Sequence, residues 1–294
     1  MKKNRVTIAV CIASFLCMLV FVVCYANLRD SYRTDRDYAF VCEEQEEYHN
    51  LEQEDHVTGT YLVEENLTAE ARSIHKKAEV TLVTVDFSPE DLFKTEAGFT
   101  RQDTDGCMLS STLADKLFGD RNITGLSVAI KEKTYLVRAV FELEEPVMIV
   151  QCGSTGGKNE ALMESKSISG VVLDVSDEMY RGQYAEEFGI RHNTGSDSYY
   201  YASDYLNILP RLELPAKWSD FDIWSKWAGE VRAISDRRTY HNKDVMETFY
   251  YRIYNKLQEY RMVILISAVL FAVSAISAIK CISRRKGFKK FIRS

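Results

Sequence analysis

The stretch ADKLFGDRNITGLSVAIKEKTYLVRAV, residues 114–140, decides the fold of this chain. It predicts a short helix, a glycine that ends it, and two strands joined by a turn. Gly119 is expected to end the helix in the left-handed conformation, and Gly125 to allow the next bend. Apolar and polar residues alternate over 126–130 and again over 135–141, which predicts two half-buried strands. No residue here resembles a nucleophile, a metal ligand or a phosphate cradle, so the stretch indicates scaffold.

The neighbouring sequence extends this mixed α/β pattern. Thr112 is expected to cap the short helix, with Asp115 reaching back to the first backbone amides. The residues around it read as β-branched strand segments and short capped helices. Strands are expected at 38–41, 58–63, 79–87, 147–151 and 170–175, helices at 68–77 and from Ser88, and a loop at 193–205.

Two uncharged apolar segments flank this pattern. Val6–Ala26 has 21 residues and Met262–Ile279 has 18. A hydrocarbon core about 30 Å thick needs roughly 20 helical residues to cross it. A buried core helix is the alternative for each, but such a helix usually keeps a polar face and these have none. We therefore expect two transmembrane helices.

Basic residues flank both segments. Because basic flanks remain in the cytoplasm, both termini are expected there and the centre outside. The expected organisation is a cytoplasmic N-terminus at 1–5, helices at 6–26 and 262–282, an outer domain at 27–261, and a basic tail at 283–294. The basic residues are Lys2, Lys3, Arg5, Lys280, Arg284, Arg285, Lys286, Lys289, Lys290 and Arg293.

Cleavage of the first segment is a competing interpretation. Residues 24–26, Cys-Tyr-Ala, loosely fit a signal-peptidase site. The apolar run nevertheless exceeds the 7–15 residues typical of a signal core, which favours a retained anchor. Lipoprotein processing at Cys24 is disfavoured because Val23 is large where a small residue is usual.

Charge excludes one class of partner. The chain of 294 residues has a formal net charge of −6. With the ten flanking basic residues set aside, 27 basic residues face 43 acidic ones, a net charge near −16 for the outer part. So acidic a domain is not expected to bind nucleic acid, whereas the basic tail suits anionic headgroups or serves as a topology signal.

Seven cysteines give no disulfide framework. Four lie in or at the membrane segments, and three, Cys42, Cys107 and Cys152, are expected outside, where at most one pair can form. The chain has no CxxC, so neither a redox site nor a zinc site of that type is expected.

Two helices are expected before and into the second apolar segment. Trp218, Trp224 and Trp227 recur at helical spacing, which indicates either a core face or a helix in the membrane interface. Residues 244–261 carry an apolar line and no breaker. A helix from Asp244 to Ile282 would have 39 residues and a length of about 58 Å, and we expect it to form a stalk.

Catalytic motifs are absent from the sequence. Gly153–Lys158 resembles a P-loop, but three residues instead of four separate its glycines and Asn159 follows the lysine. There is no HExxH or GxSxG motif. The pairs Asp55–His56 and Asp103–Asp105 fit solvated surface residues better. We therefore predict no catalytic, cofactor-binding or metal-binding residues, no cofactor and no enzyme activity. The histidines, scattered along the chain, are His49, His56, His75, His192 and His241.

Residues 83–142 resemble the periplasmic core domain of MacB-type ABC transporter permeases. The pieces occur in the family's order with similar gaps; only Ala139 stands where the family usually has glycine. They are Gly98-Phe-Thr-Arg-Gln-Asp103, Leu113-Ala-Asp-Lys-Leu-Phe-Gly119, Gly125-Leu-Ser-Val-Ala-Ile130 and Tyr135-Leu-Val-Arg-Ala-Val140.

The resemblance implies a MacB-like α/β (α+β) outer domain, with a mixed sheet and flanking helices, carried between two membrane helices in a bacterial membrane. It implies a non-catalytic subunit or accessory of an ABC-type export or signalling system. The implied partners are the lipid bilayer, an ABC ATPase and a fuller permease, with homo- or hetero-oligomers through the membrane helices. The family's permeases normally have four membrane helices. A stand-alone sensor or binding module that reuses the domain is the alternative.

Overall fold

The structure is a computed structural model. It describes residues 2–32, 36–41, 56–89, 92, 100, 102–152, 169–179, 181–184, 199–207, 221–239 and 244–292. The chain divides into two compact units: Met1–Arg33 with Ile253–Ser294, and Thr34–Arg252. We call the second unit the outer domain and describe each unit by itself.

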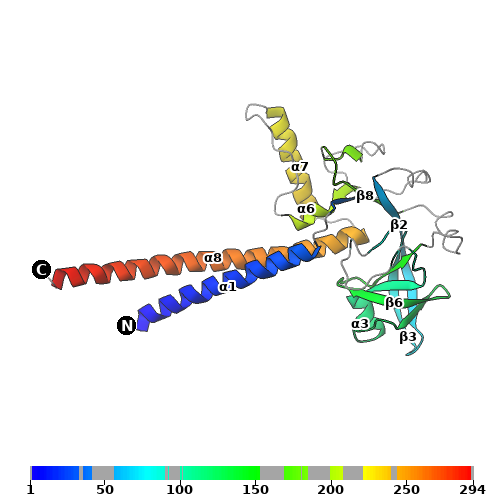
Figure 1. The fold of residues 1–294 in the computed structure, drawn as a ribbon, viewed down its shortest axis with the longest axis horizontal. Helices are drawn as coiled ribbons and strands as arrows, with labels where there is room; N and C mark the ends of the chain where they lie inside the picture. Colours follow the sequence, from blue (N-terminus) through cyan, green and yellow to red (C-terminus); the bar gives the residue numbers. More distant parts are fainter. Residues whose placement is uncertain are drawn as a thin grey trace. The chain divides into compact units, whose positions relative to one another are not determined.

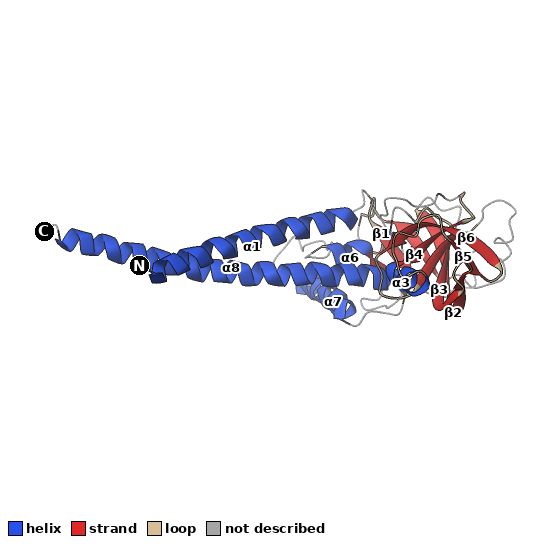
Figure 2. Cartoon of the chain, turned by 90° about the horizontal axis from the view of Figure 1, so that it is seen from below, coloured by secondary structure: helices blue, strands red, loops and turns tan. Residues whose placement is uncertain are grey.

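The outer domain combines strands with helices, as Figures 1 and 2 show: β1 to β4 come first, α3 separates them from β5 to β9, and α6, α7 and the start of α8 follow. The prediction of a mixed α/β domain between two long apolar helices is confirmed. The strands are β1 (Tyr38–Val41), β2 (Val57–Ala71), β3 (Lys76–Val85), β4 (Gly106–Ser110), β5 (Ser127–Ile130), β6 (Lys133–Phe141), β7 (Val147–Gln151), β8 (Gly170–Asp174) and β9 (Tyr199–Tyr201). The helices are α1 (Lys2–Tyr32), α3 (Ser111–Leu117), α6 (Ala202–Leu206), α7 (Phe221–Thr239) and α8 (Val245–Ile292).

Six strands form a closed ring of pairings, in the order β2, β3, β7, β4, β6, β5 and back to β2. The pairs β3–β7 and β4–β6 are parallel, and the other four are antiparallel. The 15-residue strand β2 makes closure possible, because its first half pairs with β8 and its second half with β5. A bulge between Glu64 and Leu67 separates the two halves.

Helix α3 contributes its apolar face to the core of this ring. Leu113, Ala114 and Leu117 are fully buried among side chains of β2 to β7. The predicted cap was wrong by two residues: Ser110 is the N-cap, and its hydroxyl accepts from the Leu113 amide at 3.2 Å. Thr112 instead donates to the Leu143 carbonyl at 3.0 Å, because the helix begins directly at the end of β4.

The opening stretch folds as predicted except at its first strand, where Leu126 precedes β5 and is 41% exposed, and Ala129 is buried together with Val128 and Ile130. Gly119 ends α3 with φ of 74°, and Gly125 has φ of 86° at the bend before β5. On β6, Tyr135, Val137, Ala139 and Phe141 are buried and share one face. The β5–β6 turn consists of Lys131 and Glu132, both with positive φ, which is the geometry of a tight type I′ hairpin.

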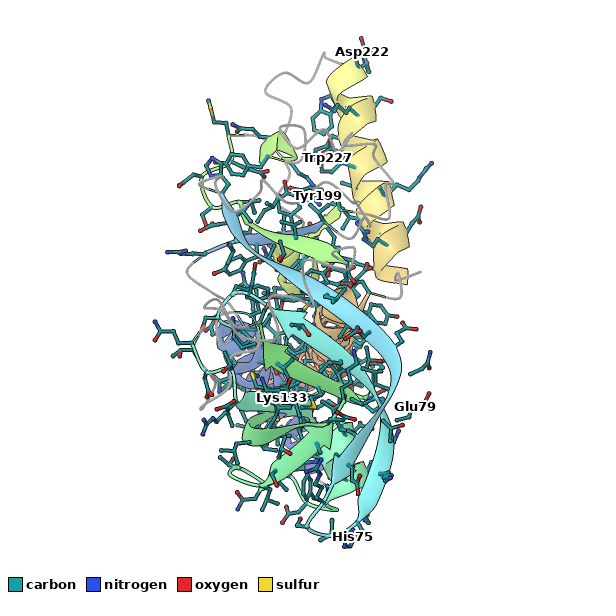
Figure 3. The ribbon with its side chains drawn as sticks, turned by 90° about the vertical axis from the view of Figure 1, so that its right-hand side faces the viewer. His75, Glu79, Lys133, Tyr199, Asp222 and Trp227 are labelled. Carbon is teal, nitrogen blue, oxygen red and sulfur yellow. The ribbon has the colours of Figure 1, made fainter. Side chains whose placement is uncertain are left out.

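The helix predicted at 68–77 was wrong, because these residues form most of a β-hairpin. Strands β2 and β3 pair in register from Leu67↔Val80 to Ala71↔Lys76. Buried Ala69 and Ala71 alternate with the more exposed Thr68 and Glu70, so burial follows a period of two. Figure 3 shows His75 at the tip of this hairpin, where its φ of 55° completes the turn.

Strands β8, β1 and β9 continue the sheet beyond β2. They build a second core, of Ala39, Val41, Val171, Leu173, Val175, Tyr184, Tyr199 and Tyr201. The loop predicted at 193–205 was wrong for its last seven residues, which form β9 and part of α6. Pairing of all three β9 residues with β1 overrides the weak local signal of the sequence.

The other unit consists of α1 and the remainder of α8, which lie side by side (Figures 1 and 2). Their contacts run in opposite directions along the two helices: Phe15 meets Phe271, Cys17 meets Ser267, and Phe21 meets Tyr260. Small buried Ser14, Ser267 and Ser274 let the two backbones approach.

Both helices are long and apolar enough to cross a membrane, over Ile8–Tyr32 and within Val245–Lys280. Large apolar side chains cover their outward faces, such as Val20, 58% exposed, and Val273, 59% exposed. The chain is thus a membrane protein with transmembrane helices. The exact predicted boundaries of its segments remain predictions.

Candidate functional site

Residues that carried weak chemical signals do not converge among those the structure describes. Asp103 forms an ion pair with Arg138, with Oδ2 2.7 Å from Nε. His56 stacks on Tyr184, with ring centroids 3.7 Å apart. No group of three His, Cys, Asp or Glu side chains in the described ranges could hold a metal ion. The P-loop-like Gly153–Lys158 lies outside the described residues, as do His49, Asp55, His192 and His241.

Cys107 and Cys152 are buried in the interior of the outer domain. Burial raises the pKa of the Cys107 thiol, so this side chain stays neutral at physiological pH. Cys42, the third cysteine of the predicted outer part, lies outside the described residues.

A polar network of the outer domain surrounds the start of α8. We call Asp244–Arg252, the N-cap and first two turns of this helix, the α8 root. The Asp244 carboxylate caps the helix, since Oδ2 accepts from the Met246 amide at 3.1 Å and from the Glu247 amide at 3.2 Å. Aspartate is among the residues favoured at this position, because its carboxylate satisfies backbone amides that the first helical turn leaves without partners.

Glu247 lies at the centre of the root and is fully buried. Its Oε1 accepts from the Tyr205 hydroxyl of α6 at 2.6 Å and from Arg237 Nε of α7 at 2.9 Å. Burial raises the pKa of Glu247, and the Arg237 charge together with both hydrogen bonds offsets part of that shift. One buried carboxylate therefore connects three helices.

Aromatic side chains pack the root against β1 and β9. Phe40 stacks on Tyr200 with ring centroids 5.0 Å apart, and its ring lies 5.5 Å from that of Tyr250. The Tyr200 hydroxyl donates to Asp244 Oδ2 at 3.0 Å. Arg237 covers the Tyr200 ring from α7 and donates to the Tyr199 carbonyl on β9. These contacts hold the α8 root against β1 and β9, at the end of the sheet that lies beyond β2 and β8.

A second buried ion pair supports α6. Arg181 donates to both carboxylate oxygens of Asp204, at 2.9 and 2.5 Å, and its guanidinium lies 4.0 Å from the Tyr201 ring centroid. Burial alone would lower the pKa of Arg181. The negative charge and the hydrogen bonds of Asp204 outweigh this effect, so the pKa of Arg181 lies above its usual value. Arg238 of α7 donates to the Asp204 carbonyl. Helices α6 and α7 are therefore joined independently of Glu247.

The root also contacts the closed ring of strands. Phe249 meets Phe141 of β6 edge-on, with ring centroids 6.3 Å apart. Arg252 Nη2 lies 3.6 Å from Glu142 and 3.7 Å from Glu144, just beyond β6. Glu142 in turn binds Arg121 at 2.7 Å. Strands from both parts of the sheet, β1 with β9 and β6 of the closed ring, thus contact the same two helical turns.

The sequence predicts the helical half of this site, the α8 root itself, but not the half that β9 and α6 contribute. Asp244, Phe249 and the helix itself follow from capping and periodicity. The partners on β9 and α6 were hidden inside the predicted loop. A usable signal was present, since Tyr199–Tyr201 are β-formers followed by a short segment with an acid in its first turn, Asp204.

Comparisons with known proteins find similar solved structures, and two of them are domains of transporters. The periplasmic region of MacB from Actinobacillus actinomycetemcomitans has a TM-score of 0.38 and 9% identity, covering 57% of this chain and 88% of that one. The extracellular domain of the noncanonic ABC-type transporter YknZ from Gram-positive bacteria has a TM-score of 0.37 and 16% identity, covering 56% and 98%. No protein-family model and no curated protein matches the chain. The first of these structures bears the family name that the sequence resemblance gives.

Proposed function

We propose that this chain is a non-catalytic, permease-like subunit or accessory of an ABC-type export or signalling system. Its outer domain meets a partner outside the membrane and couples to the membrane helices mechanically. The ordered sequence resemblance at 83–142 supports the permease-like part of the proposal. The packing of the α8 root supports the coupling part.

One observation carries the coupling. Helix α8 is continuous from Val245 in the outer domain to Ile292, and its root contacts β1 and β6, which lie on opposite sides of β2 in the strand order. Strand β1, which begins six residues after α1 ends, contacts the same root through Phe40 and Tyr250. A rearrangement of the outer domain would therefore act on the chain segments that lead into both membrane helices.

Purification of the full chain tests the association. We expect affinity capture in mild detergent to recover an ABC ATPase in a stable ratio, with vanadate-sensitive ATP hydrolysis. The decisive variant is Phe249→Ala, which weakens the packing of the root. It should leave the ATPase bound but lower the stimulation of hydrolysis several-fold. Recovery of the chain alone, as a monomer that binds a small ligand, would support the alternative of a stand-alone sensor.

Labelling of intact cells tests the proposed topology. Both termini are proposed to lie in the cytoplasm and the outer domain outside. A membrane-impermeant maleimide should label Ile74→Cys, at the exposed hairpin tip, without permeabilisation. It should label Ser294→Cys only after permeabilisation. The reverse order would place the chain the other way round.

A further inference from the structure

An aromatic and a basic side chain, Tyr25 and Arg261, meet where the first apolar segment ends and the second one begins. Tyr25 lies on α1 and Arg261 on α8, within the same unit. Arg261 Nη2 and Nε donate to the Tyr25 hydroxyl at 2.9 and 3.3 Å. The guanidinium lies 5.3 Å from the Tyr25 ring centroid, so the contact is both a hydrogen bond and a cation–π pair.

The position of this pair matches a membrane boundary. From Arg261 to Lys280 the helix rises about 28 Å, and from Arg5 to Tyr25 about 30 Å. Both lengths equal the roughly 30 Å thickness of a hydrocarbon core. Phe21 and Tyr260 meet edge-on beside the pair, with centroids 5.9 Å apart. Amphipathic aromatic rings concentrate at the level of the lipid headgroups.

Arg261 has donors left over at this level. A guanidinium has five N–H donors, and one phenolic oxygen cannot accept from all of them. Among the residues that the structure describes, the Tyr25 hydroxyl is the acceptor recorded for Arg261, and no carboxylate forms an ion pair with it. The remaining N–H groups are therefore available to an anionic acceptor beside the helices. Planar guanidinium groups match phosphate oxygens in two-point contacts.

We propose that Tyr25 and Arg261 form a binding site for the phosphate group of a phospholipid, in the leaflet next to the outer domain. Tyr25 orients the guanidinium along one edge, and the remaining N–H groups hold two phosphate oxygens. The lipid then fixes the depth at which α1 and α8 cross the bilayer. This inference rests only on the membrane-spanning helices, so it stands or falls independently of an ABC-type partner.

Native mass spectrometry of the full chain tests the proposal. The protein is purified in a maltoside detergent, which contains no phosphate, and titrated with dilauroyl phosphatidylglycerol. We expect Arg261→Gln to lower the affinity for the first bound lipid roughly tenfold, since a charge-assisted contact is lost. Tyr25→Phe should lower it several-fold. The matched control is Lys256→Gln, which removes the same charge from α8 nearer the outer domain and should leave the affinity unchanged.

Two further arms identify the source of the phosphate. Inorganic phosphate at millimolar concentration, without lipid, should neither raise the melting temperature nor compete with the lipid. Competition that depends on Arg261 would make the site a small-anion site and overturn the lipid proposal. Equal lipid affinity in the wild type and Arg261→Gln, or an equal loss in Lys256→Gln, would overturn it as well. Unchanged helical circular dichroism in all variants establishes that each one folds.

Discussion

At the scale of single residues, the burial of Glu247 in the α8 root disfavours the ionised form of its carboxyl group. Its carboxylate is fully buried, and burial raises its pKa despite the neighbouring Arg237. Because the pKa is higher in the folded protein than in the unfolded chain, the stability that Glu247 contributes is complete below the ordinary carboxyl value of 4.5. That contribution to stability is lost as the pH rises through the raised pKa that Glu247 has in the folded protein.

Glu247→Gln should remove this dependence. Glutamine can still accept from Arg237 and Tyr205 but does not titrate. We expect the variant's free energy of unfolding to fall less steeply than that of the wild type as the pH rises from about 4.5. Urea unfolding of the full chain in detergent, monitored by tryptophan fluorescence at each pH, measures the free energy of unfolding. The matched control, Glu230→Gln on α7, should keep the wild-type profile, and parallel profiles for all three proteins would contradict the prediction.

Gly170 is a second residue with a sharp steric requirement. A Cβ atom there would lie 2.4 Å from the Tyr61 ring and 2.6 Å from the Val41 carbonyl oxygen. Gly170→Ala should therefore destabilise the outer domain by about 1–3 kcal/mol. Gly229→Ala on α7 meets no atom within 4 Å and should instead stabilise by about 0.5–1 kcal/mol, because alanine favours helix. Urea unfolding of both variants decides, and equal effects would refute the steric argument.

At the scale of elements, the turn of the β5–β6 hairpin holds a non-glycine residue in a strained left-handed backbone conformation, which a substitution can relieve. Glu132 adopts φ of 69°, a conformation that glycine accepts at little cost. Glu132→Gly should raise the free energy of unfolding by about 1 kcal/mol, whereas Glu132→Ala should give no gain because alanine has the same Cβ. Thermal unfolding of the two variants compares them directly. A gain in the alanine variant would mean that loss of the charge, and not of strain, is responsible.

Prediction from sequence succeeded where local patterns and tertiary packing agree. The alternation on β6 and the glycines at 119 and 125 define their elements without help from distant residues. The α8 helix is similarly determined by its cap at Asp244 and its apolar segment. For the same reason one half of the α8 root, including Phe249, could be predicted to face a core.

Prediction failed where pairing with distant strands decides the conformation. Residues 68–77 contain helix formers such as Ala69 and Glu70, yet β2 and β3 bury their small alternate side chains in the closed ring. Tyr199–Tyr201 become a strand because β1 supplies every partner. Local propensity cannot reveal such contacts, so the β9 and α6 half of the α8 root could not be predicted.

At the scale of the whole molecule, α8 belongs to both units, and its pairing with α1 defines how the two helices cross the bilayer. The hydroxyl of Ser267 lies 3.5 Å from the thiol of Cys17. Ser267→Cys should therefore form a disulfide with Cys17 on mild oxidation. After proteolysis within the outer domain, the two fragments should migrate together on a non-reducing gel.

The control for this cross-link is Leu265→Cys, whose side chain is 59% exposed and faces away from α1. It should give separate fragments, and so should Ser267→Cys combined with Cys17→Ser. Cross-linking at position 265 but not at 267 would mean that the two helices meet through other faces.

The closed ring of six strands has a consequence for how the protein meets its surroundings. Each of these strands has a neighbour on both sides over at least part of its length, which leaves little backbone edge open to templating by a foreign β-segment. Residues 76–80 of β3 are an exception, because they pair with β2 but not with β7. Among the described strands, β9 ends the sheet, and its Tyr199 carbonyl already accepts from Arg237. Most of the ring therefore presents side chains, and not open backbone edges, to other molecules, which disfavours edge-to-edge stacking between crowded copies in one bilayer.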